Sequence, residues 1–160
     1  MTPASATSRN DALRAEIAGF QALINVLEAE ADALRRADAE ALSILSNAKL
    51  ERVAALQALA RDRSIEIKRA GLPETAAGAK LWATQGGTDG EACAQAWERL
   101  TKLALEAKRQ NDVNGRLAAR QRWHFDAALG ALLQAAGVSS LYGADGRARR
   151  TSVSQSHLTA

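Results

Sequence analysis

A register of mainly apolar positions in the second half of the chain constrains the possible fold more than any other feature of the sequence. It consists of positions spaced alternately by four and three residues, which share one helical face: Cys93, Trp97, Leu100, Ala104, Ala107, Asn111, Asn114, Ala118, Gln121, Phe125, Ala128 and Leu132. The register predicts a helix over residues 91–136, which would be roughly 70 Å long if the polar residues 111–115 do not interrupt it. Because three of these positions are amides, and a buried amide costs stability unless its hydrogen bonds are met, we interpret this face as a surface that meets another molecule.

Two further helices are predicted ahead of this one, over residues 10–36 and 39–70, because apolar side chains recur in both with helical spacing. The first helix carries Leu13, Ile17, Phe20, Ile24, Leu27, Ala31 and Leu34, and the second carries Leu45, Val53, Leu56, Ala60 and Ile67. Lys49 falls within the second stripe. We expect its stem to follow the edge of the core and its ammonium group to reach water.

The ends of these two helices carry recognisable signals. Asn10 or Asp11 is placed to cap the first helix, and Asp38 to cap the second after a tight reversal. Gly71 followed by Pro73 marks the end of the second helix. Since consecutive amphipathic helices bury their faces most easily against each other, the reversal predicts an antiparallel pair.

The composition favours an all-α fold. Apolar residues make up 47% of the chain but aromatic residues only 4%, whereas a sheet favours β-branched and aromatic side chains. We predict an elongated antiparallel helical bundle or coiled coil of three long helices. The first two would extend only roughly 40 and 48 Å. The second half of the third helix, after Gly115, is therefore expected to leave an apolar face uncovered.

The chain is expected to divide into a flexible N-terminus (residues 1–9), a helical domain (10–137) and a flexible, disordered C-terminal docking tail (138–160). In this tail, Leu141 and Tyr142 have the form of a short docking motif. The alternative is that Tyr142 folds back onto the end of the bundle.

The segment between the second and third long helices, residues 73–90, is rich in glycine. Pro73 to Thr75 would nevertheless allow a short helix to start there and continue through Trp82. The ring of Trp82 is expected to pack on the bundle, as large aromatic side chains usually do.

Charge and targeting signals limit the possible partners and compartments. The formal net charge is +3, with 21 basic and 18 acidic residues mixed along the chain, so nucleic-acid binding is a minor alternative. Cys93 is alone and forms no internal disulfide, which fits a reducing compartment. No stretch has the roughly 18 apolar residues of a membrane span, and Met1 to Asn10 lacks a signal segment. We expect a soluble cytoplasmic protein.

No pattern typical of catalysis or metal binding is found. The two histidines, His124 and His157, are far from Cys93 in the sequence. His124, between two aromatic residues, is expected to be partly buried. The glycine-rich residues 86–90 lack the preceding strand and the following lysine of a phosphate-binding loop. We therefore expect neither an enzyme nor a protein that carries a cofactor or a metal.

Two motifs point to a known family. The last helix contains NDVNGRL at residues 111–117, with the pattern Asn-x-x-Asn-Gly-x-Leu, and the tail contains LYGADG at 141–146 followed by TSVS at 151–154. In this order, at the end of an all-helical chain, they resemble the FlgN-type flagellar export chaperones. Looser matches lie at Asp38, Leu42, Lys49 and Trp97.

The resemblance implies a cytoplasmic chaperone of the flagellar type III export system. Such chaperones bind the C-terminal helices of the hook–filament junction proteins, prevent their premature assembly and deliver them to the membrane export gate. We assign cargo binding to residues on the last helix: Asn111, Asn114, Gly115, Leu117, Gln121, Phe125, Ala128 and Leu132. The amides would set the register, and Gly115 would allow a close backbone approach or a bend. The resemblance assigns docking to the gate to Tyr142.

Two other classes of function remain open. One is a structural coiled-coil protein that buries its uncovered face in a homodimer. The other is a basic helical protein that binds nucleic acid, with an affinity that falls steeply as salt increases.

Overall fold

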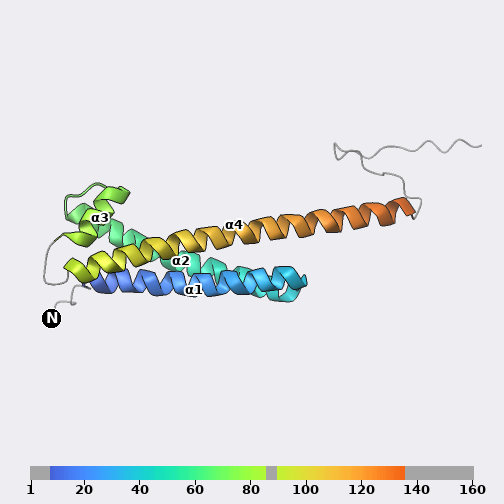
Figure 1. Ribbon diagram of the computed structural model, residues 1–160, viewed down its shortest axis with the longest axis horizontal. Helices are drawn as coiled ribbons and strands as arrows, with labels where there is room; N and C mark the ends of the chain where they lie inside the picture. Colours follow the sequence, from blue (N-terminus) through green and yellow to red (C-terminus); the bar gives the residue numbers. More distant parts are fainter. Residues whose placement is uncertain (1–7, 86–89, 136–160) are drawn as a thin grey trace, which may run out of the picture. The chain divides into compact units, whose positions relative to one another are not determined.

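The computed structural model describes residues 8–85 and 90–135, and residues 1–7, 86–89 and 136–160 lie outside this description. The described residues form four helices, α1 (Arg9–Arg36), α2 (Ala39–Arg69), α3 (Ala76–Thr84) and α4 (Gly90–Ala135), and no strand (Figure 1). The all-α prediction is confirmed. The chain divides into two structural units, residues 1–118 and 119–160.

Helix α1 begins one residue earlier than the sequence suggested. Its N-cap is Ser8, whose hydroxyl oxygen accepts a 3.1 Å hydrogen bond from the backbone N–H of Asp11. The predicted caps Asn10 and Asp11 were therefore wrong, and both residues lie within the helix. Asp11 stabilises the first turn in a different way, because its negative charge lies at the positive end of the helix dipole.

The predicted tight reversal joins α1 and α2 through two residues. Ala37 adopts the left-handed conformation, with φ of 53°, and the N–H of Asp38 donates to Ala33 O at 3.0 Å, which satisfies a carbonyl at the helix end. The Asp38 side chain then caps α2 by accepting from Ala41 N–H at 3.0 Å, as predicted.

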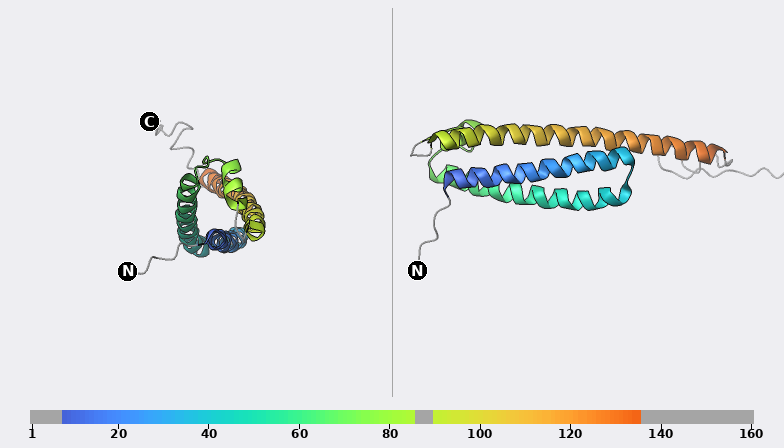
Figure 2. Two further views of the ribbon diagram at one scale, coloured as in Figure 1. Left: turned by 90° about the vertical axis from the view of Figure 1, so that its left-hand side faces the viewer. Right: turned by 60° about the horizontal axis from the view of Figure 1, so that its bottom comes forward.

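Helices α1 and α2 pack closely side by side and run antiparallel (Figures 1 and 2). Gly19 of α1 allows this close approach, since a Cβ atom at this position would lie 2.8 Å from a methyl carbon of Leu56 in α2. The two apolar stripes face each other as predicted: Leu13, Ile17, Leu27, Ala31 and Leu34 are buried in α1, and Leu56 and Ile67 in α2.

Besides the three long helices, the structure contains the short helix that the sequence allowed between Pro73 and Trp82, namely α3. Thr75 is the N-cap of α3, and its hydroxyl oxygen accepts a 3.2 Å hydrogen bond from Gly78 N–H. Trp82 of α3 is only 4% exposed, and its ring packs on the bundle as expected. Gly78 is required for the tight start, because a Cβ atom there would overlap the Pro73 carbonyl oxygen at 2.0 Å.

Helix α4 is helical from Gly90 to Ala135, with no break at residues 111–115. Gly115 therefore causes neither an end nor an interruption of the helix. Within residues 1–118, α4 runs in the same direction as α1 and opposite to α2 (Figures 1 and 2).

Two apolar clusters hold the unit of residues 1–118 together. The first joins all four helices through Leu13, Ile17, Ile67, Ala79, Trp82, Ala83, Cys93 and Leu100. The second, farther along the bundle, contains Leu23, Leu27, Leu56 and Ala107 from α1, α2 and α4. Phe20 packs against both clusters and so marks the boundary between them.

A buried ion pair lies beside the first cluster. Glu16 of α1 is 2% exposed, and its Oε1 lies 3.0 Å from Nε of Arg63 in α2. Neither atom makes an aligned hydrogen bond, so the contact is mainly a charge interaction. Burial raises the pKa of the Glu16 carboxyl above its ordinary value, while the positive charge of Arg63 acts in the opposite direction.

Candidate partner-binding surfaces

A buried polar cluster connects the three long helices at Asn114. The Asn114 amide nitrogen donates hydrogen bonds to Leu27 O at 2.7 Å and to Glu30 Oε2 at 2.8 Å, both in α1. The other carboxylate oxygen of Glu30 accepts from the ammonium group of Lys49 in α2. The three side chains, Glu30, Lys49 and Asn114, therefore form one continuous contact from α2 through α1 to α4.

This cluster changes the interpretation of two residues. Lys49 was expected to extend its ammonium group into water, but that group is paired with Glu30 and the side chain is only 26% exposed. Asn114 was predicted to face cargo, yet it is 3% exposed and its donor atoms are used inside the chain. Its role in the free protein is to set the position of α4 along α1, since a shift of one residue would break both hydrogen bonds.

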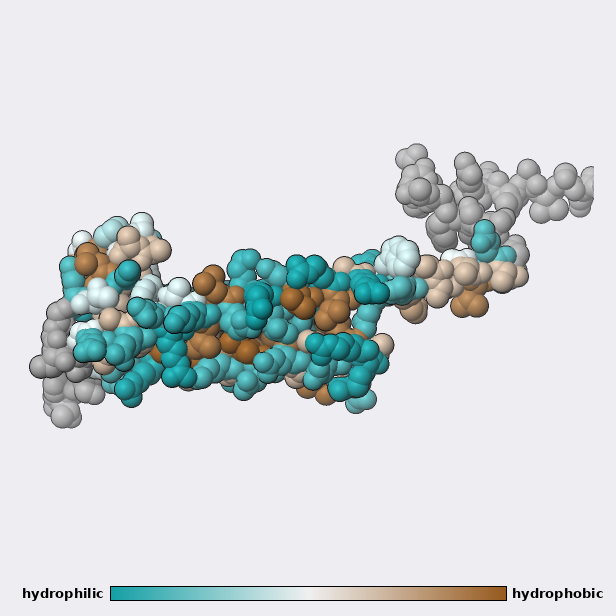
Figure 3. All heavy atoms as spheres, viewed as in Figure 1, coloured by the Kyte–Doolittle hydropathy of each residue, from teal (hydrophilic) through white to brown (hydrophobic). Residues whose placement is uncertain are grey.

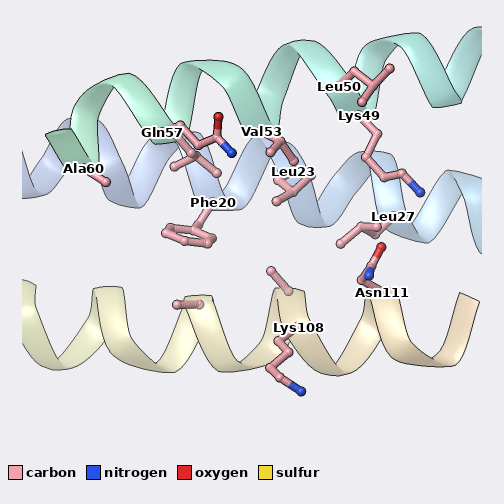
Figure 4. A pocket seen from close by; sticks show the side chains of 13 residues that line it. Phe20, Leu23, Leu27, Lys49, Leu50, Val53, Gln57, Ala60, Lys108 and Asn111 are labelled. Atoms are coloured by element: carbon pink, nitrogen blue, oxygen red, sulfur yellow. The ribbon is translucent and has the colours of Figure 1, made fainter. Parts of the chain in front are cut away.

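An apolar groove with a volume of about 470 Å³ opens between α2 and α4 beside this cluster. Phe20, Leu23 and Leu27 of α1 form its floor, and the walls come from α2 and α4 (Figure 4). The residues that line the walls are Lys49, Leu50, Val53, Leu56, Gln57 and Ala60 on α2, and Ala104, Ala107, Lys108 and Asn111 on α4. The sequence prediction included only Asn111 of these residues.

Most of the α2 wall belongs to the predicted stripe of this helix, namely Lys49, Val53, Leu56 and Ala60. That stripe was assigned to packing on α1, so its part in an open groove was missed. Leu50, next to Lys49, is 65% exposed and lies outside that stripe, yet it lines the groove. An exposed leucine by itself is common on protein surfaces, so the sequence contained no signal that separated Leu50 from other exposed apolar residues.

The last turns of α4 carry large apolar side chains on the surface. Every residue from 122 to 135 is exposed, and these include Trp123, Phe125, Leu129, Leu132 and Leu133. Figure 3 shows the visible surface of these turns as mostly apolar. The prediction that the second half of the last helix leaves an apolar face uncovered is therefore confirmed. His124 is exposed rather than partly buried, and its ring makes a T-shaped contact with the ring of Trp123, with centroids 4.9 Å apart.

The residues predicted to bind cargo fall into three groups. Asn114 is buried in the unit of residues 1–118, Leu117 and Gln121 are half-buried, and the remaining ones are exposed: Asn111, Gly115, Phe125, Ala128 and Leu132. Gly115 has open space around it, with no atom within 4 Å of a Cβ built there. A partner backbone therefore has room to approach Gly115. Tyr142 lies outside the described residues.

Other kinds of site find little support in the described part of the chain. Within residues 8–85 and 90–135, no three His, Cys, Asp or Glu side chains are grouped so that they could hold a metal ion. The described helices also include none whose length and apolar content would suffice to cross a membrane.

The fold and these surfaces define a helical protein with two open apolar areas. A model of the FlgN protein family matches residues 1–150. The chain therefore belongs to the FlgN family, as the two motifs suggested, and this membership places it among the flagellar export chaperones, which bind hook-associated proteins and are not enzymes. Comparisons with curated proteins and with solved structures gave no match.

Proposed function

We propose that this protein works in the cytoplasm, binds the C-terminal helices of the hook–filament junction proteins, prevents their premature assembly and delivers them to the type III export gate. The observation that carries the proposal is the exposed apolar side of α4 on which Phe125 and Leu132 lie. Exposed apolar areas of this kind mark interaction sites. An amphipathic helix that lies against them would bury its own apolar stripe at the same time.

The proposed contact residues are the exposed members of the predicted set together with the half-buried Leu117. Phe125, Ala128 and Leu132 follow one another at spacings of three and four, so they lie on one side of α4. Leu117 extends this side towards residues 111–115, where Asn111 and Gly115 are open to solvent. Asn114 contributes indirectly, because its hydrogen bonds to α1 fix how α4 is rotated.

The test combines two substitutions, Leu117→Asp and Phe125→Asp. We expect the affinity for a purified hook–filament junction protein to fall by about a hundredfold or more, because a buried apolar contact is replaced by a charge at two places. Isothermal titration calorimetry measures the affinity, and circular dichroism should show nearly unchanged helicity, since Phe125 is 69% exposed in the free protein.

The matched control replaces two other exposed apolar residues of α4, Leu105 and Trp123, by aspartate. Trp123 precedes Phe125 by two residues and so points to a different side of the helix. Equal loss of binding in both double variants would contradict the proposed contact side. A wild-type protein that forms a tight dimer by light scattering and binds no junction protein would favour the structural homodimer instead.

Delivery to the gate is proposed to depend on Tyr142. Replacing Tyr142 by alanine should leave the affinity for cargo unchanged and reduce secretion of the junction proteins severalfold, because the docking contact is on a different segment from the cargo contact. Tyr142→Phe, which keeps the ring, separates the contribution of the hydroxyl group. Unchanged secretion by Tyr142→Ala would rule out the docking role.

A further inference from the structure

A polar pocket with a volume of about 420 Å³ lies between the first turns of α1 and α4, which begin at the same end of the unit of residues 1–118 (Figure 2). The described residues that line it are Asn10, Arg14 and Ile17 on α1, and Ala92, Gln95, Ala96 and Arg99 on α4. Ile17 is buried in the first apolar cluster, and Ala96 packs against that cluster. The pocket therefore has an apolar base that belongs to the core, with polar side chains around it.

Two guanidinium groups line this pocket, one from each helix. Arg14 and Arg99 are both exposed, and within residues 8–85 and 90–135 neither side chain has an ion-pair or hydrogen-bond partner. None of the described residues that line the pocket is acidic. Like charges that share a pocket repel each other, whereas an anion between them is attracted by both. The two positive charges of this pocket are therefore uncompensated by the described chain.

The lack of a partner for Arg14 is not a matter of spacing. Elsewhere in the chain an arginine pairs with the acidic residue three positions before it, as Arg109 does with Glu106 at 2.7 Å. Asp11 is at the same spacing from Arg14, but its carboxylate accepts a 2.8 Å hydrogen bond from the Ser8 hydroxyl at the start of α1. The Arg14 guanidinium group is thus left available for another anion.

Two amide side chains add hydrogen-bond donors beside the arginines. The Asn10 side chain is half-buried. The Gln95 amide nitrogen donates to Glu91 at 3.3 Å, which is a long hydrogen bond that an anion in the pocket can replace. Since α1 and α4 both begin beside the pocket, the positive ends of their dipoles add to the charge of the guanidinium groups.

The charge and the size of the pocket suit a phosphate group. A guanidinium group donates two parallel N–H bonds to the oxygens of a phosphate or a carboxylate. A carboxylate has one charge and two oxygens, which is enough for one guanidinium group, whereas a doubly charged phosphate can be shared by two. A volume of about 420 Å³ is within the range of small-molecule pockets, roughly 300–1,000 Å³, and leaves room for an organic group against Ile17 and Ala96.

We propose that this pocket binds a phosphate group, either as inorganic phosphate or as part of a small phosphorylated molecule. Arg14 and Arg99 bind the phosphate oxygens from opposite sides of the pocket, and Asn10 and Gln95 donate further hydrogen bonds. The pocket shares no residue with the surface proposed to bind cargo, and it does not depend on the proposed function.

The first experiment titrates inorganic phosphate into the full chain at constant ionic strength, with isothermal titration calorimetry as the measurement. We expect a dissociation constant of about 1 mM or below. Arg14→Gln and Arg99→Gln should each weaken binding by about tenfold or more, because each removes charge-assisted hydrogen bonds. Arg99→Lys, which keeps the charge but loses the two parallel donors, should still bind more weakly than the wild type.

The matched control is Arg52→Gln on α2. Arg52 is exposed, does not line this pocket and has no ion-pair partner within the described residues, so the substitution changes the net charge by the same amount. Phosphate affinity should stay within about twofold of the wild type. If phosphate does not bind at about 10 mM, or if Arg52→Gln and Arg99→Gln weaken binding equally, the pocket is not a phosphate site and the proposal is overturned.

Three further titrations identify the form of the ligand. Tighter binding of adenosine monophosphate than of inorganic phosphate, with no binding of adenosine, supports a phosphorylated small molecule as the ligand. Equal binding of adenosine monophosphate and inorganic phosphate supports free phosphate. Acetate that binds as tightly as phosphate shows that the pocket attracts any anion, and it overturns the assignment to phosphate.

Thermal unfolding provides a second measurement that does not depend on binding heats. Phosphate at ten times its dissociation constant should raise the Tm of the wild type by roughly 4 °C. The double variant Arg14→Gln and Arg99→Gln shows how much of this rise is a general effect of phosphate on protein stability. An equal rise in Tm for the wild type and the double variant would contradict a phosphate site between α1 and α4.

Discussion

Replacing Glu30 by alanine is expected to lower the free energy of unfolding by about 2–3 kcal/mol. The Glu30 carboxylate accepts a hydrogen bond from Asn114 and pairs with Lys49, and the residue is almost fully buried. Without it, the ammonium group of Lys49 loses its partner, and the Asn114 amide keeps only its hydrogen bond to Leu27 O. Removing one member of a buried charged cluster costs more than the interaction contributes, because the remaining members stay desolvated.

Urea denaturation followed by circular dichroism measures this change. The matched control is Glu28→Ala, two residues earlier on α1, where the glutamate is exposed and the expected change is within about 0.5 kcal/mol. A double-mutant cycle with Lys49→Met isolates the ion pair from the hydrogen bond to Asn114. If Glu30→Ala and Glu28→Ala were equally stable, the cluster would have no role in holding α4 to α1.

Replacing Trp82 by alanine is expected to lower the free energy of unfolding by about 3–5 kcal/mol. The Trp82 side chain is buried in the first cluster, and the Arg9 guanidinium lies 5.1 Å from its ring centroid. Helix α3 has only nine residues, too few to be stable in isolation. Loss of the indole ring should therefore detach α3 from the bundle as well as leave a cavity.

Two measurements separate this effect from a general loss of stability. Trp123→Ala provides a control of the same residue type, because Trp123 is 66% exposed and its removal should cost no more than about 0.5 kcal/mol. The thiol of Cys93, the only cysteine, is buried in the same cluster as Trp82. It should react faster with a thiol reagent in Trp82→Ala under native conditions, since α3 opens locally. Equal costs for the two tryptophans would contradict the role of α3.

The positions of the long helices followed from the sequence alone. Apolar spacing of three and four, together with Asp38 as a cap and Gly71 near an end, predicted helices whose observed bounds differ by no more than one residue. These signals are local, because a helix depends on contacts between residues up to four apart. Ser8 was missed in favour of Asn10 and Asp11, since all three residue types can cap a helix and only the backbone shows which one does.

The candidate site was predictable only in part. The sequence indicated that residues 125–132 carry an apolar side that the two shorter predicted helices could not reach. In the structure these residues are exposed. It did not distinguish Asn111 from Asn114, which are three residues apart and belong to the same register. Asn111 lines the groove, whereas Asn114 is buried against α1, because a small rotation of a helix decides which of two neighbouring positions points into the core.

Contacts between residues far apart in the chain were decided by the tertiary structure. Lys49 and Glu30 are 19 residues apart, and Asn114 and Glu30 are 84 apart. The groove likewise needs side chains from α1, α2 and α4 together. Periodicity along a chain identifies the side of a helix that avoids water, but the identity of what covers that side depends on how helices pack in three dimensions. The sequence therefore determined the helices, the family and the exposed apolar end, and the packing decided which amide stabilises the protein and where a groove remains open.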